Sequence, residues 1–450
     1  MGVRAVENLL GAQMRQARRD SGLRFDEFAR RARFSVTYLR NVEGGSRPAT
    51  PAIADAYDRV LATGGRFRAA VADALAAAER TEAYPYRRRA PKAWDQPGNM
   101  SVLAELLDRS DVERRRFIAA SGSILTDCAV RWSSALGRAR LPEHPASTVR
   151  MRQADGRLID HIDQRLDLLR HLDDELGSGE HAALARNELA FVVRLLKTGS
   201  HSERSEKRLY SLASEASRQT AWSNFDQGNH AAAQAYFEGA MRASANADDA
   251  TAGAYALSFL AVHCYSTGNA REAVSLLDSA QSALSGQTTP KMSAMLAARS
   301  ARANSKAGER TASIRDLSAA RVHLDRGPRQ DDPSVLYWVT EAEIEMIAGS
   351  CALELGDPAE ALRRFDAALA ADYQGDDQYP RSAAIYLARA AEAHLALHDL
   401  DAAVARATHA ARCLGSVDSV RSSSTLAGLH AKLEAHVASP VVRAYLEGVA

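Results

Sequence analysis

Cysteine is scarce in this chain of 450 residues, which contains only four. They lie far apart, and no two form a CxxC pair: Cys128, Cys264, Cys351 and Cys413. Disulfide-rich domains and structural zinc sites need several closely spaced cysteines. We therefore expect no disulfide framework and no zinc site, and we expect reduced thiols in a cytoplasmic protein.

Long apolar runs are also missing. The N-terminus begins with an amphipathic segment around Glu7 and lacks the basic start and apolar stretch of a signal peptide. Residues 114–130 imitate a twin-arginine signal, but they lie deep in the chain. Their apolar part contains Asp127 and is shorter than the roughly 20 residues that span a bilayer. We expect a buried helix there and no membrane partner.

The common motifs of catalysis are absent from the sequence. It has no glycine-rich phosphate loop, no HExxH motif and no nucleophile accompanied by a base in the pattern of covalent catalysis. Residues 161–175 bring His161 and His171 near several acids, but an amphipathic helix with a solvated acidic face explains them better than a metal site does. We expect no enzyme, no cofactor and no metal.

The net charge of +1 conceals an uneven distribution. The first 92 residues contain 18 arginines and lysines against 10 acidic residues, a net charge of +8, so the remainder carries −7. A basic module joined to an acidic body indicates that the first part meets a polyanion and that the second does not.

The basic module contains the signals of five helices. Apolar spacing, N-caps and glycine ends predict helices at about residues 7–20, 25–32, 36–43, 51–61 and 66–80. The second and third of these helices are short and are expected to cross steeply, with the small residue Ala29 where they touch. The apolar anchors on their inner faces are expected to be Phe28, Ala32, Leu39 and Val42.

This pair of helices resembles the helix-turn-helix of the XRE (Cro/repressor-like) regulators. The resemblance is carried by Phe28-Ala29, Ala32, Ser35, Tyr38-Leu39, Val42-Glu43 with the following glycine, and RPATP at 47–51. It implies that bases of double-stranded DNA are read by Val36, Thr37 and Asn41. It implies backbone contacts from Ser35, Tyr38, Arg40 and Arg47, and the neighbouring Arg30 and Arg33 are expected to contact phosphates as well.

Two residues depart from that family's pattern. Arg33 stands where the turn usually has glycine, and Phe25 stands where a glutamine commonly bonds a phosphate. We expect slight strain from the first and the loss of one phosphate contact from the second. The competing interpretation of the module is a helical corner with a solvated basic face.

A second pattern recurs after residue 150. A turn residue at 228, 268, 308, 356 and 398 is followed at fixed distances by small and large apolar residues, so that the spacings are 40, 40, 48 and 42. The pattern resembles the tetratricopeptide repeat, a helical hairpin, although its period exceeds 34 residues. Residues 324–335 form an inserted loop, and a further degenerate hairpin is expected over 181–217 with Gly199 at its turn.

Stacked hairpins form a superhelix whose concave face binds ligands. The first helix of each hairpin is expected to direct these residues inward: Trp222, Phe225, Tyr255, Val262, Tyr265, Arg299, Arg302, Glu343, Met346, Arg389 and Glu392. An aromatic end that passes into an Arg/Glu stretch suits a short peptide with a carboxylate, and the ligand that the domain senses is expected to be a peptide or a small molecule. The competing interpretation is that Trp222 and the tyrosines are hairpin core.

The whole chain is thus expected to be all-α, with a five-helix DNA-binding domain (1–82), a basic proline-rich linker (83–100), connecting helices (101–150) and a repeat solenoid (151–450). It resembles actinobacterial regulators that join an XRE domain to a tetratricopeptide sensor, an architecture shared with peptide-pheromone receptors. That resemblance implies a homodimeric transcription regulator that binds an inverted-repeat operator and senses an effector. The alternative is a protein-interaction scaffold with a weak or auxiliary DNA-binding module.

Overall fold

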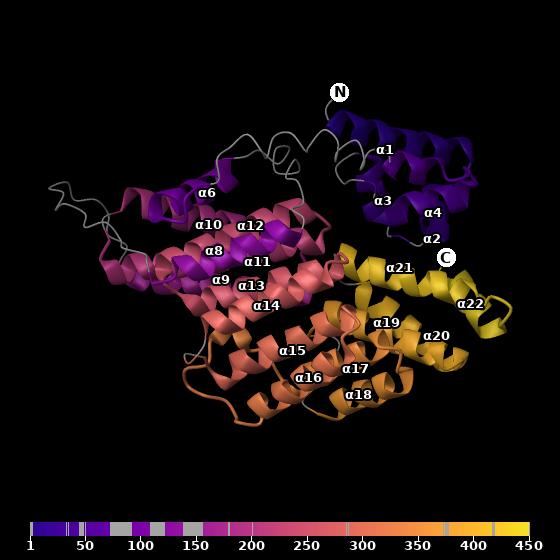
Figure 1. Ribbon diagram of the computed structural model, residues 1–450. Coiled ribbons are helices and arrows are strands. Elements are labelled where there is room, and N and C mark those ends of the chain that lie inside the picture. The colour runs from indigo at the N-terminus through magenta and orange to yellow at the C-terminus, as the bar shows by residue number, and fades with distance from the viewer. Residues whose placement is uncertain are drawn as a thin grey trace.

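The computed structural model describes residues 3–32, 34, 36–44, 49, 51–72, 92–108, 122–137, 156–178, 181–199, 201–284, 286, 288–371, 373, 378–415 and 419–449. Within these ranges the regular elements are all helices, which confirms the predicted all-α fold. Figure 1 shows a small N-terminal group of helices beside the C-terminal helices α21 and α22, and a large stack of paired helices.

The N-terminal group contains four helices at the predicted positions. They are α1 (Val3–Asp20), α2 (Phe25–Ala32), α3 (Val36–Glu43) and α4 (Pro51–Leu61). Gly22 ends the first of them in a left-handed conformation with φ of 72°. Of the predicted fifth helix, residues 66–72 are helical, and the remainder lies outside the described residues.

In the described residues after the linker, the next helices are α6 (Gln96–Asp108) and α8 (Gly122–Ala135). Helix α6 begins at Gln96, inside the segment 83–100 that was predicted as linker. The Asp95 carboxylate accepts a hydrogen bond from the Gly98 amide at 2.8 Å and helps to begin this helix. Trp132 of α8 is buried and donates to the Ser244 hydroxyl at 2.8 Å. The part of 114–130 that the structure describes thus packs on the repeats. No helix in the described segments combines the length and apolar character needed to cross a bilayer.

The repeat region is built of paired helices. Their bounds are α9 (Gly156–Leu176), α10 (His181–Thr198), α11 (Glu203–Asp226), α12 (His230–Ala247), α13 (Ala250–Ser266), α14 (Ala270–Ala283), α15 (Pro290–Lys306), α16 (Arg310–Leu324), α17 (Glu341–Glu354), α18 (Pro358–Ala370), α19 (Pro380–Ala396), α20 (Leu400–Leu414), α21 (Val420–Glu434) and α22 (Pro440–Val449). A short 3₁₀ helix, η2 (Ser334–Leu336), lies in the connection before α17.

All five predicted turn residues lie between the two helices of a hairpin. The four glycines, 228, 268, 308 and 356, have φ between 79° and 89°, a left-handed conformation that costs glycine little. His398 adopts the same region at 61°. Gly199 likewise lies between α10 and α11, as predicted.

Small residues bring the two helices of a hairpin together, as the repeat pattern predicts. Ala233, Ala273 and Ala361 are completely buried, and the large residues beside them are buried too. Gly349 shows how close the approach is, because a Cβ added there would lie 2.6 Å from the Phe365 ring.

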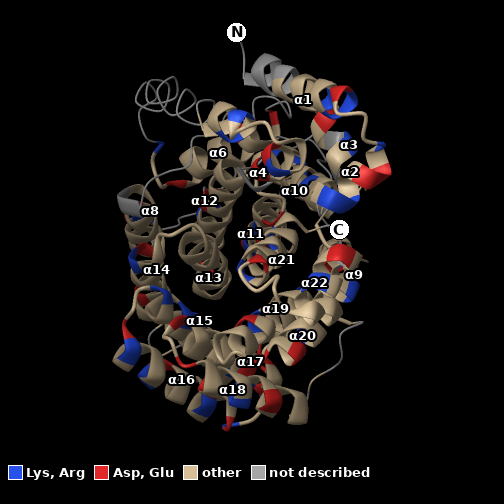
Figure 2. Ribbon diagram, turned by 90° about the vertical axis from the view of Figure 1, so that its right-hand side faces the viewer, with Lys and Arg blue, Asp and Glu red and all other residues tan. Residues whose placement is uncertain are grey.

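The stack curves until its two ends meet. Figure 2 shows the hairpins following an arc from α12 through α15 and α18 to α20 and α22. The Arg381 guanidinium of α19 donates to the Asp173 carboxylate of α9 at 2.8 Å, although 208 residues separate them. This contact joins the late repeats to the early ones and bounds a cavity between them.

Candidate functional sites

The crossing of α2 and α3 is held by the predicted anchors. Phe28, Ala32, Leu39 and Val42 are each no more than 1% exposed, and Ala29 is buried where the helices touch. Helix α1 also approaches closely, since a Cβ added to Gly11 would lie 2.4 Å from the Val42 carbonyl oxygen. The position of α3 is therefore fixed by packing on its inner face.

A buried polar network fixes the C-terminal end of α3. The Glu43 carboxylate accepts two hydrogen bonds from the Arg18 guanidinium, at 2.7 and 2.8 Å, and one from the Tyr57 hydroxyl at 2.8 Å. Burial, together with the adjacent carboxylate, raises the pKa of Tyr57. Because the partners come from α1 and α4, the network ties α3 to both of its neighbours.

The residues predicted to contact DNA are only partly described. Val36 is half-buried at the start of α3, and Arg30 and Arg40 are exposed at the ends of α2 and α3. Thr37, Tyr38 and Asn41 belong to α3, but their side chains lie outside the described residues, as do Arg33, Ser35 and Arg47.

Phe25 has a role that the sequence did not predict. The Arg18 guanidinium lies 4.3 Å from the centre of its ring, and that of Arg40 lies 5.4 Å away. Such cation–π contacts hold a guanidinium in place. Phe25, which stands where the XRE-type pattern commonly has glutamine, thus contacts Arg40, a residue predicted to contact the DNA backbone.

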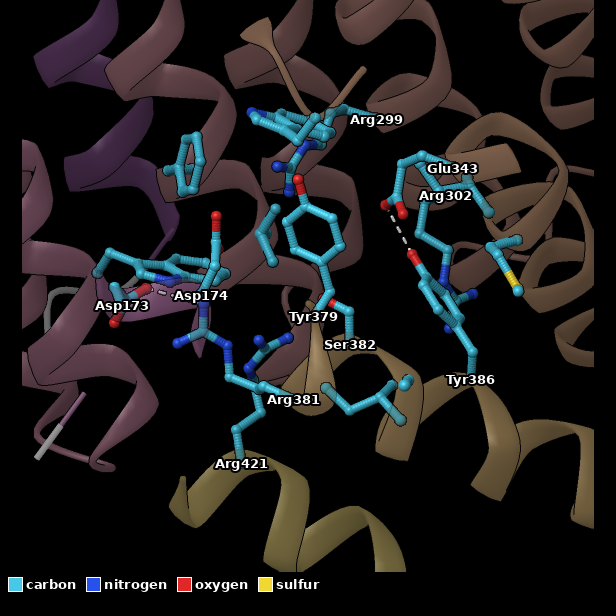
Figure 3. A pocket seen from close by; sticks show the side chains of 18 of the residues that line it. Asp173, Asp174, Arg299, Arg302, Glu343, Tyr379, Arg381, Ser382, Tyr386 and Arg421 are labelled. Carbon is cyan, nitrogen blue, oxygen red and sulfur yellow. Dashed lines mark hydrogen bonds and ion pairs between the residues drawn. The ribbon is translucent and has the colours of Figure 1, made fainter. Parts of the chain in front are cut away.

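The repeat region contains a partly open cavity of about 210 Å³. Nine of the eleven residues predicted to face the groove line it: Trp222, Tyr255, Val262, Tyr265, Arg299, Arg302, Glu343, Met346 and Arg389. They come from α11, α13, α15, α17 and α19, the first helices of successive hairpins. Figure 3 shows Arg302, Tyr386 and Glu343 on one side of the cavity, Asp173, Asp174 and Arg381 on the other, and Tyr379 between them.

The other two predicted groove residues do not reach the cavity. Phe225 is 3% exposed and packs against Trp222, with ring centres 5.4 Å apart, and against His263 of the next hairpin. Glu392 forms an ion pair with Lys432 of α21 at 3.0 Å. Phe225 is therefore core, and Glu392 joins α19 to α21, because each points to a neighbouring helix instead of the concave face.

One end of the cavity is neutralised by matched ion pairs. The Asp173 carboxylate accepts from Arg381 at 2.8 Å, and Asp226 accepts from Arg421 at 3.2 Å. Although burial alone would raise it, the pKa of Asp173 lies well below its usual range because Arg381 is so near. The predicted solvated acidic face of 161–175 is wrong at Asp173, which is only 5% exposed. Its distant partner on α19 left no local signal in the sequence.

The opposite end contains arginines with few partners. The Arg299 guanidinium lies between the rings of Phe259 and Trp338, 4.8 and 5.0 Å from their centres, and it has no hydrogen-bond or ion-pair partner among the described residues. The Arg389 guanidinium donates to the Ser350 hydroxyl at 2.7 Å. Burial and the neighbouring Arg302 lower the pKa of Arg389 to about 10.

The Glu343 carboxyl group lines the same end of the cavity as these arginines. It accepts a hydrogen bond from the Tyr386 hydroxyl at 2.7 Å. Burial raises its pKa to about 7, against the opposing effects of Tyr386, Arg299 and Arg389. Glu343 is therefore neutral in a substantial fraction of molecules near neutral pH.

The inserted loop contributes a wall of the cavity. Trp338 follows η2 and donates from its indole to the Tyr255 hydroxyl at 3.2 Å, and that hydroxyl donates to the Val335 carbonyl at 3.0 Å. The sequence indicates the insertion but not this contact, because nothing in the loop's composition shows which helix it covers. Tyr337, in the same connection, was missed for this reason. Tyr379, directly before α19, and Tyr386, within α19, also line the cavity, at positions that the alignment of turn residues did not select.

Comparison with known proteins supports the assignment of the first module. A family model described as a helix-turn-helix domain matches residues 9–71, which include most of α1 and all of α2, α3 and α4. The comparison with curated proteins finds none that matches this chain. The N-terminal module is thus a helix-turn-helix domain, followed by a region of repeat-like paired helices, and this combination suggests a DNA-binding regulator.

Proposed function

We propose that this protein is a sequence-specific transcription regulator of the XRE type, with a tetratricopeptide-like domain that senses an effector, and that it is not an enzyme. The observation that carries the proposal is the helix-turn-helix domain, in which buried contacts fix α3 while Arg40 stays exposed. The cavity in the repeats supports the sensing role, because it lies on the predicted concave face.

On DNA, α3 enters the major groove, where Val36, Thr37 and Asn41 contact base edges. Arg30 and Arg40 contact phosphates and set the orientation of the module. A homodimer places two such helices about 34 Å apart, one turn of DNA, and therefore prefers an inverted repeat.

Helix α21 is the proposed connection between cavity and DNA-binding domain. Near its N-terminus, Arg421 lines the cavity and binds Asp226. At its C-terminus, Glu434 forms an ion pair with Arg59 of α4 at 2.5 Å. Figure 1 shows α21 beside the N-terminal helices. An effector that binds one position of α21 more tightly than another shifts the arrangement of the two recognition helices in the dimer.

Selection of bound fragments from genomic DNA, at low and near-physiological salt, tests the proposal. We expect one inverted-repeat motif to survive the higher salt, because base contacts persist when phosphate contacts weaken. The double variant Thr37→Ala/Asn41→Ala should lose sequence preference, at about 1–3 kcal/mol for each base contact. Thr198→Ala/Asn269→Ala, the same changes in the repeats, should retain it. Diffuse binding that disappears with salt would instead favour the scaffold alternative.

A further inference from the structure

The cationic end of the cavity carries more positive charge than its surroundings balance. Arg299 and Arg302 come from α15, and Arg389 comes from α19. Arg302 is 5% exposed, and its guanidinium donates to the Ser305 hydroxyl at 2.9 Å. Its nearest carboxylate oxygen, on Glu354, lies at 3.4 Å and is shared with Lys306 at 2.7 Å.

Two of these guanidinium groups have donors that remain unused. The Nε atoms of Arg299 and Arg302 are buried without a hydrogen-bond partner in the described part of the chain. A buried donor that lacks a partner costs free energy, and most such donors in native proteins are satisfied. Both residues line the cavity, so an oxyanion bound there would balance the positive charge of their guanidinium groups.

At the other end of the cavity, the Nε atoms of Arg170 and Arg381 likewise lack a hydrogen-bond partner among the described residues. The arginines there are nevertheless paired with carboxylates, so the surplus of positive charge is local. There, Arg170 and Arg218 both bind the Glu215 carboxylate, with nitrogen–oxygen distances of 2.9 and 2.8 Å. Arg381 and Arg421 are paired with acids in the same way. A bound anion is therefore expected at the end that contains Arg299, and no second anion is expected at the other.

Apolar surface lies directly beside the cationic end. Trp338 and Phe259 flank Arg299, and Trp222 packs edge-to-face on Phe259 with ring centres 4.9 Å apart. Val262, Met346 and Ile347 also line the cavity. Its volume of about 210 Å³ is below the roughly 300–1,000 Å³ of pockets for drug-sized ligands. The site therefore suits a small ligand with an apolar body better than an extended peptide.

We propose that the cavity binds a small organic anion, an aromatic or apolar body that carries a carboxylate or a similar oxyanion. The anionic group lies on Arg299, Arg302 and Arg389, and the body lies against Trp338, Phe259 and Trp222. The proposal deepens the effector role proposed above and depends on that role only in treating this cavity as the effector site.

Two probes that differ only in charge test the class of ligand. The full-length protein is titrated with 2-naphthoate and with its neutral amide, 2-naphthamide, and binding is followed by calorimetry and by tryptophan fluorescence. We expect 2-naphthoate to bind at least about tenfold more tightly, since hydrogen bonds to charged groups are strong. Sulfate, which fits the arginines without the apolar walls, should compete with it.

The variants Arg299→Gln and Arg389→Gln should each remove most of the preference for the anion. Arg363→Gln is the matched control, because Arg363 is on α18, its side chain is 67% exposed and it does not line the cavity. Circular dichroism and thermal unfolding establish that each variant is folded. Equal affinity for both probes, an unchanged preference in the two cavity variants, or no binding of either naphthoate or sulfate would overturn the proposal.

These measurements need no DNA, so the two proposals fail separately. If the protein selects an operator but shows no preference for the anionic probe, the proposed class of ligand is refuted and the proposed regulatory function stands. A preference that depends on Arg299, in a protein that selects no operator, would refute the regulator and leave the anion site.

Discussion

Two buried groups of charged side chains in this protein contrast sharply. In the helix-turn-helix domain, Arg18, Glu43 and Tyr57 form a network in which Glu43 accepts from both partners at normal distances. In the repeat cavity, Arg299 has no hydrogen-bond or ion-pair partner among the described residues, and Arg302 has a long contact with a shared carboxylate. Glu43 and Arg302 are both buried and Arg299 is half-buried, but only the first group is complete.

Complete and incomplete pairing indicate different roles for the two groups. A fully paired network needs nothing further and fixes one arrangement of helices, as Glu43 does for α3. An incomplete one carries a free-energy cost in the free protein that a ligand can relieve. On this basis we interpret the first network as structural and the second as the proposed binding site.

The largest effect is expected from breaking the complete network. Glu43→Ala leaves the Arg18 guanidinium and the Tyr57 hydroxyl buried without their acceptor, so the domain should lose about 3–5 kcal/mol of stability. Chemical denaturation of the full chain, followed by a signal from the N-terminal domain, measures this loss. Glu27→Ala is the control, because Glu27 forms an exposed pair with Arg31 and should contribute less than about 1 kcal/mol. Similar losses in both variants would contradict the structural role.

The second prediction compares a paired arginine with an unpaired one in the same cavity. Arg381→Gln should destabilise the repeat domain by about 3 kcal/mol, because Asp173 and Asp226 would keep their buried charges without it. Arg299→Gln should be neutral or stabilise by about 1 kcal/mol, because it removes a cation that lacks a carboxylate partner. Unfolding curves of the two variants without ligand decide between these outcomes. Equal destabilisation by the two substitutions would contradict the proposed difference in charge pairing between the two ends of the cavity.

The third prediction concerns pH and Glu343. Its folded pKa of about 7 exceeds the ordinary value of 4.5, so its contribution to stability is fully present below pH 4.5 and is lost as pH rises through 7. Relative to Glu343→Gln, the protein should therefore lose stability over this window.

The same ionisation should weaken binding of the anionic probe. Above pH 7 the Glu343 carboxylate competes for Arg299 and Arg389, so the affinity for 2-naphthoate should fall by up to about tenfold per pH unit. Titrations from pH 6 to 8 measure the slope. If the pH dependence of the affinity is unchanged in Glu343→Gln, another group releases the proton that weakens binding. Asp174, whose pKa of about 6 is close to that of Glu343, would then be the next candidate.

The smallest effect is expected at Phe25. Phe25→Leu keeps the apolar volume but removes the ring beneath Arg40, and a contact of this kind is worth about 0.5–1 kcal/mol at an exposed site. Affinity for a selected operator fragment should therefore fall about two- to fivefold. If Phe25 acts by holding Arg40, the substitution should have no further effect in an Arg40→Gln background. An additional loss there would show that Phe25 acts independently of Arg40.

Local patterns in the sequence determined the elements of this fold. Helix periodicity predicted α1 to α4, and the recurring turn residues predicted five hairpins whose turn positions are correct. Small residues such as Ala233 and Ala273 also indicated where paired helices approach. These features were predictable because caps, turns and the spacing of a helix face involve residues only a few positions apart.

The tertiary structure alone decided how the cavity is completed. Whether a residue on a first helix faces the cavity or a neighbour depends on how successive hairpins rotate, so Tyr265 lines the cavity whereas Phe225 is core. The pairing of Asp173 with Arg381 joins positions 208 residues apart. The accumulated curvature of the whole stack determines which arginines lie close enough to a carboxylate to form an ion pair. Among the described residues, Arg299 is one that does not. No local spacing in the chain records that curvature, because it is the sum of small rotations between many packed helices.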